Sequence, residues 1–144
     1  MPDSQEDLHR RDPRRGKRSL KELYNENNRE KGSAYEELAA SFFIEKNYTI
    51  LVRNYRTKTG EIDLVVQDPD DGCVVFVEVK YRKSTRKGQP FESVTSRKQS
   101  KIYRTAQWFI KENGLGQYRK YRFDVLSILD GKITHIRNAF GGFC

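Results

Sequence analysis

A hairpin pattern in residues 60–80 constrains the fold of this chain more than any other feature. The segment holds two apolar runs, IDLVV and CVVFVEV, which are rich in β-branched residues and separated by the turn sequence PDDG. Runs of this kind bounded by Gly, Pro and Asp predict two antiparallel strands, and a four-residue loop between them is usually built around a type I turn. This loop sets Asp68 opposite Cys73, and the same register sets Asp63 opposite Glu78.

Charged side chains appear where these two strands leave the apolar part of the pattern. Side chains alternate along a strand, so Glu78 and Lys80 share one face. Opposed like charges destabilise a sheet, and Asp63 facing Glu78 therefore needs a shared proton or a cation. A divalent metal with oxygen ligands would meet that need. A one-residue change in the loop would separate the acids, and Lys80 could instead only pair with Glu61 or Glu78.

Basic residues cluster directly after this hairpin. The formal net charge is +8, and in residues 80–104 only Glu92 opposes the basic side chains. Such a surface would attract a polyanion, although an ordinary solvated basic loop would have the same composition. The basic residues that we predict to bind nucleic acid are Arg82, Lys83, Arg86, Lys87, Arg97, Lys98 and Lys101.

The remaining sequence predicts an α/β fold. We expect a first helix capped at Ser33, strands over 48–55, 62–66 and 73–79, a helix over 96–112 that ends at Gly114, and strands over 121–129 and 132–137 around an Asp130–Gly131 turn. This order, α-β-β-β-α-β-β, predicts a mixed sheet with helices on both sides. We expect Trp108 and Phe109 to lie in the core.

Composition limits the other classes of protein. Residues 1–31 are poor in apolar groups and predict a basic, flexible arm, which leaves residues 32–144 as one domain. The 2 cysteines provide no disulfide framework and fit a reducing compartment, so we expect a cytoplasmic protein. No apolar run approaches the ~20 residues of a membrane span. His9 and His135 lie far apart without matching partners, which disfavours histidine catalysis and zinc.

Several sequence blocks together resemble a known family. GEIDLVV, VFVEVKYRKS, VTSRKQ, YRFDVLSI and ITHIRNAF occur in order within residues 31–140. They are similar to the YraN-like family of small bacterial proteins, which belongs to the restriction-endonuclease-like, or PD-(D/E)xK, nuclease superfamily. The resemblance implies a three-layer α/β/α core.

The resemblance also implies roles for individual residues. Asp63 and Glu78 match the two acidic metal ligands, and Lys80 matches the lysine that orients or activates the attacking water. Glu36 matches an upstream acid that often completes the metal site, although it could instead only cap its helix. Ile62 stands where the motif has proline, and Tyr35 where the family usually has glycine.

A second pattern of the superfamily falls on the predicted helix over 96–112. Gln99 and Tyr103 form a QxxxY pattern similar to that of some exonucleases in the superfamily, where the glutamine helps to hold the site. Gln99 is therefore added to the predicted nucleic-acid-binding residues. Tyr103 could equally be a core residue and Gln99 a surface group of the helix.

Three functions remain open from the sequence. The first is a Mg²⁺- or Mn²⁺-dependent nuclease that acts on nucleic acid, with DNA favoured over RNA. The second is a nucleic-acid-binding module that does not catalyse, and the third is an interaction scaffold with a nuclease-like fold. The intact set of Asp63, Glu78 and Lys80 favours the first, because a protein without turnover has no chemical need for all three.

Overall fold

The computed structural model describes residues 34–84, 86, 94–116 and 119–141. The predicted arm over 1–31, the cap at Ser33 and the predicted contact residue Lys87 lie outside these ranges. The described residues belong to one compact unit, Ala34–Cys144. Within them, no helix combines the length and the apolar character needed to cross a membrane.

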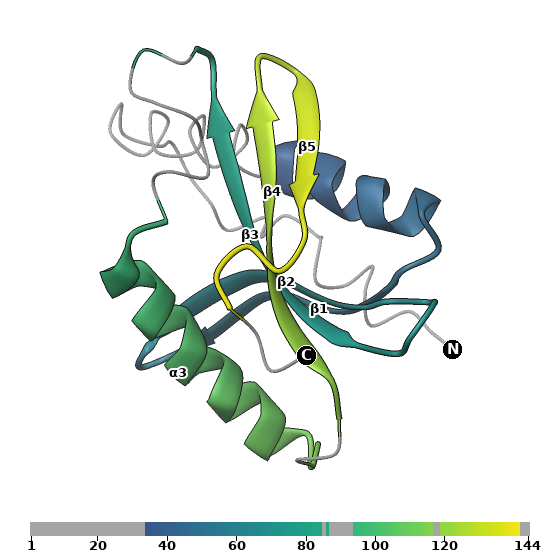
Figure 1. The fold of residues 1–144 in the computed structure, drawn as a ribbon, viewed down its shortest axis with the longest axis vertical. Helices are drawn as coiled ribbons and strands as arrows, with labels where there is room; N and C mark the ends of the chain where they lie inside the picture. The colour runs from purple at the N-terminus through teal and green to yellow at the C-terminus, as the bar shows by residue number, and fades with distance from the viewer. Residues whose placement is uncertain (1–33, 85, 87–93, 117–118, 142–144) are drawn as a thin grey trace, which may run out of the picture. The chain divides into compact units, whose positions relative to one another are not determined.

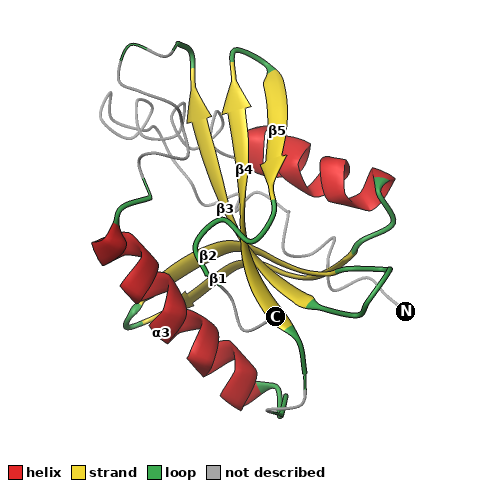
Figure 2. Ribbon diagram, in the orientation of Figure 1, coloured by secondary structure: helices red, strands yellow, loops and turns green. Residues whose placement is uncertain are grey.

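The order of elements agrees with the sequence prediction (Figures 1 and 2). A helix over residues 34–45 comes first. It is followed by β1 (Thr49–Thr57), β2 (Gly60–Gln67), β3 (Val74–Arg82), α3 (Ser96–Glu112), β4 (Tyr121–Leu129) and β5 (Lys132–Ile136). The bounds of α3 and β4 are those predicted, whereas β1 lies later than the predicted 48–55 and β5 ends one residue earlier.

The five strands form one mixed sheet. Their spatial order is β1-β2-β3-β4-β5, and every pairing is antiparallel except that of β3 with β4. Parallel neighbours need a crossover connection, and α3 is part of that connection. Asp130 (φ 49°) and Gly131 (φ 76°) both lie in the left-handed region between β4 and β5, as a two-residue type I′ hairpin requires.

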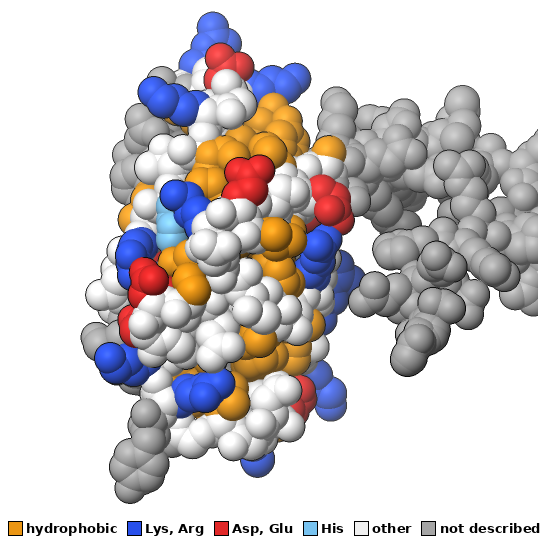
Figure 3. Space-filling view, turned by 90° about the vertical axis from the view of Figure 1, so that its right-hand side faces the viewer, with side chains coloured by type: hydrophobic (Ala, Val, Ile, Leu, Met, Phe, Trp, Pro, Cys, Tyr) orange, Lys and Arg blue, Asp and Glu red, His pale blue; other side chains and the backbone are white. Residues whose placement is uncertain are grey.

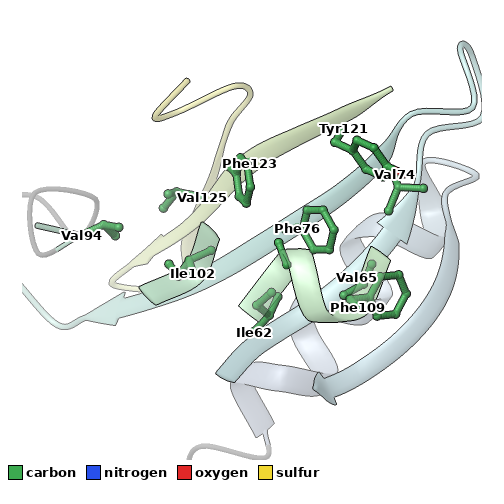
Figure 4. Packing of buried hydrophobic residues seen from close by; sticks show 11 residues of the cluster. Ile62, Val65, Val74, Phe76, Val94, Ile102, Phe109, Tyr121, Phe123 and Val125 are labelled. Carbon is green, nitrogen blue, oxygen red and sulfur yellow. The ribbon is translucent and has the colours of Figure 1, made fainter. Parts of the chain in front are cut away.

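Apolar side chains on both faces of the sheet form two separate clusters. On one face, Val74 and Phe76 of β3 pack with Phe109 of α3 (Figure 4). On the other face, Val75 and Val77 pack with side chains of the helix over 34–45, including Ala39 and Phe43. Alternation along β3 thus places a helix against each face. The predicted α/β/α arrangement is confirmed.

Candidate functional site: an acid pair at the open end of the β2–β3 hairpin

The hairpin has the register that the sequence predicts. Leu64 pairs with Val77, and the register continues unchanged to the turn, where the Asp68 N–H donates to the Cys73 carbonyl at 2.9 Å. Extended one step the other way, it sets Asp63 opposite Glu78. At this position the Asp63 side chain, and not a backbone carbonyl, accepts the hydrogen bond from the Val79 N–H, with Oδ2 at 2.8 Å. We call Asp63 and Glu78 the acid pair.

The acid pair is electrostatically unfavourable. Burial raises the pKa of Asp63, repulsion by Glu78 raises it further, and the N–H of Val79 only partly opposes them, so the pKa reaches about 7. Glu61 and a side-chain hydrogen bond with Glu78 add to the increase. Near neutral pH the pair therefore holds a proton readily, or accepts a cation in its place.

Lys80 lies beside the acid pair. Its Nζ is 3.2 Å from Glu78 Oε1, and the two side chains are only 21% and 17% exposed. Lys80 is also level with the buried Ser127 of β4 in the parallel ladder. The ion pair with Glu78 is one of the partnerships that the sequence left open. It holds the amine next to a carboxylate at the site.

Glu36 reaches the neighbouring strand rather than the acid pair. Its Oε2 accepts a hydrogen bond from Asn54 Nδ2 at 3.2 Å. Among the residues that the structure describes, no three or more His, Cys, Asp or Glu side chains are placed to hold a metal ion. The structure thus brings Asp63, Glu78 and Lys80 together, and a metal-ligand role for Glu36 stays a prediction.

Asn54 is a site residue that the sequence did not indicate. Arg53 pairs with Leu64 and Tyr55 with Ile62, so Asn54 falls opposite Asp63. Its backbone is left-handed, with φ 54°, and its buried Oδ1 has no hydrogen-bond partner among the residues that the structure describes. Asn is depleted in strands. An Asn within the predicted first strand is therefore the one sequence signal that could have pointed to this left-handed residue.

The predicted basic residues lie at the end of β3 and along α3. Arg82 is half-buried, and exposed positions are held by Lys83, Arg86, Arg97, Lys98 and Lys101. The opposite side of the molecule differs, because Figure 3 shows Lys and Arg there interspersed with Asp and Glu. On α3 itself, no acidic residue stands between Arg97 and Lys111.

The other side chains singled out on α3 divide between packing and exposure. Gln99 Nε2 donates to the Val94 carbonyl at 3.0 Å. The Tyr103 hydroxyl donates to the carbonyls of Phe140 and Gly141, and its partly buried ring packs against the core cluster beneath α3. Phe109 is buried as predicted, but the core prediction for Trp108 is wrong, because its side chain is 44% exposed.

A second charged cluster lies on the sheet face that the helix over 34–45 covers. Arg122, on β4, donates to Asp68 Oδ2 at 2.7 Å and to both oxygens of Asp124 at 3.1 and 3.2 Å. All three side chains are buried. His135 Nε2 lies 2.7 Å from Asp124 Oδ2, which corrects the expectation that this histidine has no partner. We call Asp68, Arg122, Asp124 and His135 the buried network.

Hydrogen bonds dominate the electrostatics of the buried network. Burial acts to raise the pKa of Asp68, but hydrogen bonds from Arg122 and the Asp70 N–H outweigh it and lower the pKa. Burial likewise acts to raise the pKa of Asp124, yet hydrogen bonds from His135 and Arg122 lower it. Both carboxylates are therefore stable as anions.

Comparison with other proteins identifies the family. Residues 35–128 match the uncharacterised protein family UPF0102. The chain belongs to this family. It is 48% identical over 117 residues to a UPF0102 protein of Syntrophomonas wolfei, which covers 78% of this chain and 99% of that one.

Other relatives are similar over the same extent. A UPF0102 protein of Lachnoclostridium phytofermentans is 42% identical over 81% of this chain and 98% of its own length. One of Aliivibrio fischeri is 42% identical over 79% of this chain and 94% of its own. The prediction of an uncharacterised bacterial family is thus confirmed, and this chain covers more than nine-tenths of the length of each of these relatives.

Proposed function

We propose that this protein is a divalent-metal-dependent nuclease with a restriction-endonuclease-like core, acting on DNA. The observation that supports the proposal is the acid pair, in which the half-buried Asp63 faces a glutamate and a lysine amine lies 3.2 Å from that glutamate. Two opposed carboxylates are costly unless a proton or a cation joins them. A divalent cation bound between Asp63 and Glu78 would neutralise their repulsion, and this is why we infer a metal site at this end of the sheet.

The residues present fit Mg²⁺ or Mn²⁺. Asp63 and Glu78 offer oxygen ligands, which hard divalent cations prefer, and Glu36 is a candidate third ligand. When bound, the ion would polarise a phosphodiester oxygen and lower the pKa of a water. Lys80 would stabilise negative charge on the phosphate or orient the attacking water, while the exposed basic residues of α3 would hold the nucleic acid. The 2 cysteines favour action in the cytoplasm.

One observation favours a second candidate. The Lys80 amine already pairs with Glu78. If this ion pair neutralises the glutamate, a metal ion is not needed there, and the protein would bind nucleic acid without cutting it. The same fold would serve in that case as a binding module or scaffold.

Cleavage by Lys80→Ala protein decides between the candidates. Purified wild type and variant would be incubated with Mn²⁺ and a panel of linear, flapped and branched DNAs. Lys80→Ala should keep its fold and DNA affinity but lose about 10²–10³ in rate, as expected for one preorganised charge-stabilising group. Lys80→Arg should not restore full activity, because a planar guanidinium replaces a compact ammonium.

The matched control is Lys120→Ala, an exposed lysine next to the start of β4, which should cleave like wild type. Equal residual cleavage by wild type and Lys80→Ala would point to a contaminant and leave the binding module as the better description.

A further inference from the structure

Helix α3 presents a basic stripe that ends in an exposed tryptophan. Residues three and four apart lie on one helix face, and five exposed side chains follow that spacing. We call this set, Arg97, Lys101, Arg104, Trp108 and Lys111, the α3 stripe. It contains four cations and no acid.

Trp108 is not needed for the core. The buried face of α3 consists of Ile102, Thr105, Ala106 and Phe109. The Trp108 side chain is 44% exposed, and Lys111 Nζ lies 5.6 Å from the centre of its ring. Beside the ring is a hollow of about 310 Å³, lined by Thr59, Arg104, Gln107, Trp108 and Lys111. A partly exposed aromatic side chain thus borders this hollow together with two cations.

The α3 stripe lies next to the strand that carries Asp63. A Cβ added at Gly60, the first residue of β2, would be 3.3 Å from Thr105 Oγ1 and 3.8 Å from Lys101 Cβ. Thr59 Oγ1 also lies 2.9 Å from Thr105 Oγ1. The glycine therefore permits close packing of α3 on the start of β2, three residues before Asp63. A nucleic-acid strand bound along α3 would pass near the candidate site.

We propose that the α3 stripe binds single-stranded DNA, with phosphates along its cations and one unpaired base stacked on Trp108. Proteins that bind single strands combine a basic track with aromatic side chains on which bases stack. Bases in a duplex are already stacked on one another, so the aromatic face selects unpaired segments. This inference rests on the proposed function, and it narrows the substrate to DNA with a single-stranded region.

The chain contains 1 tryptophan, so its fluorescence reports on Trp108 alone. In EDTA, without cleavage, a single-stranded dT oligonucleotide should quench this fluorescence and a blunt duplex of equal length should not. Trp108→Ala should weaken binding of the single strand by about 5- to 150-fold, which corresponds to the ~1–3 kcal/mol of base stacking. Trp108→Phe should retain most of the affinity.

Two controls separate stacking from charge. Arg104→Ala should reduce the salt slope of binding by about 1, whereas Trp108→Ala should leave that slope unchanged. Ile44→Ala, which removes an apolar side chain that is 51% exposed on another helix, should bind like wild type.

Three outcomes would overturn the proposal: binding of single strands without quenching, equal loss of single-strand and duplex affinity in Trp108→Ala, or self-association that Trp108→Ala abolishes in the absence of DNA binding. The measurement is independent of catalysis. If single strands bind and quench but no DNA is cut in Mn²⁺, the nuclease proposal fails and the binding surface stands. If duplex is cut and Trp108 is irrelevant, only the binding surface fails.

Discussion

The acid pair and the buried network contain the same kinds of charge in opposite arrangements. In the buried network, Arg122 lies between two carboxylates and donates to both. In the acid pair, the two carboxylates face each other and Lys80 contacts Glu78 from the side. The first arrangement satisfies its charges within the fold, and the second leaves negative charge for a cation to neutralise. Composition alone therefore does not distinguish a stabilising cluster from a candidate site.

The two regions also respond to pH with opposite signs. The pKa of Asp68 and that of Asp124 are lowered in the folded state, so their contribution to stability is present above the ordinary aspartate pKa and is lost in acid. The pKa of Asp63 is raised to about 7, so the folded state binds a proton that the unfolded state has released. Stability from that group is present below pH 4 and is lost as the pH rises through 7.

The largest expected effect comes from breaking the buried network. Arg122→Met should lower the free energy of unfolding at pH 7 by up to about 3–5 kcal/mol, because Asp68 and Asp124 lose the guanidinium that they share. Asp68 then keeps only Arg137, at 3.2 Å, and Asp124 keeps His135, at 2.7 Å. Urea denaturation measures the loss. Lys120→Met, an exposed change on the adjacent residue, should stay within about 0.5 kcal/mol of wild type. Similar stability of Arg122→Met and wild type would show that the network is not structural.

Neutralising the acid pair should have the opposite sign. In Asp63→Asn, the amide oxygen can still accept the Val79 N–H while its nitrogen donates to Glu78. At pH 8 without metal, the free energy of unfolding should rise by about 1–4 kcal/mol, given ~1.4 kcal/mol for each pKa unit. The gain should vanish toward pH 4. Glu45→Gln, an exposed acid of the first helix, is the control, and a metal-free loss of stability in Asp63→Asn would assign that acid a structural role.

A cation should relieve the same repulsion. With Mn²⁺ at ten times its dissociation constant, wild type should gain about 1.4 kcal/mol of unfolding free energy at pH 8. Asp63→Asn should gain almost nothing, which thermal denaturation with and without EDTA would show. An equal gain in both proteins would locate the ion elsewhere.

The smallest effect on stability is expected at Glu36. Glu36→Gln should stay within about 0.5 kcal/mol of wild type without metal, because the amide oxygen still accepts from Asn54. Calorimetry should show weaker Mn²⁺ binding if the carboxylate is a third ligand. Unchanged affinity would restrict the site to Asp63 and Glu78.

Local sequence was sufficient for the parts of the molecule that local chemistry determines. The loop after Asp68 sets the hairpin register, and a cap at Thr95 with a regular apolar face sets α3. The prediction from sequence failed where an apolar residue occupies a helix position that faces solvent. Trp108 is apolar, but it is rotated by about 100° from buried Phe109, which directs it to the surface.

Long-range contacts were beyond sequence reasoning for a different reason. Asp68, Arg122 and His135 are distant in the chain and meet only because β2, β3, β4 and β5 are neighbours in that order. Asn54 required knowledge of one backbone angle in β1, which no periodic pattern reveals.

The parallel pairing of β3 with β4 has a consequence for the order of folding. The β2–β3 hairpin closes a short loop, whereas Val74 must find Tyr121 far along the chain, and long loops close at greater entropic cost and more slowly. We expect the hairpin to bring Asp63 and Glu78 together while water still surrounds both. Their repulsion becomes costly only when α3 and β4 dock over the hairpin. The penalty then arises in the slow long-range docking step and not in the formation of the hairpin.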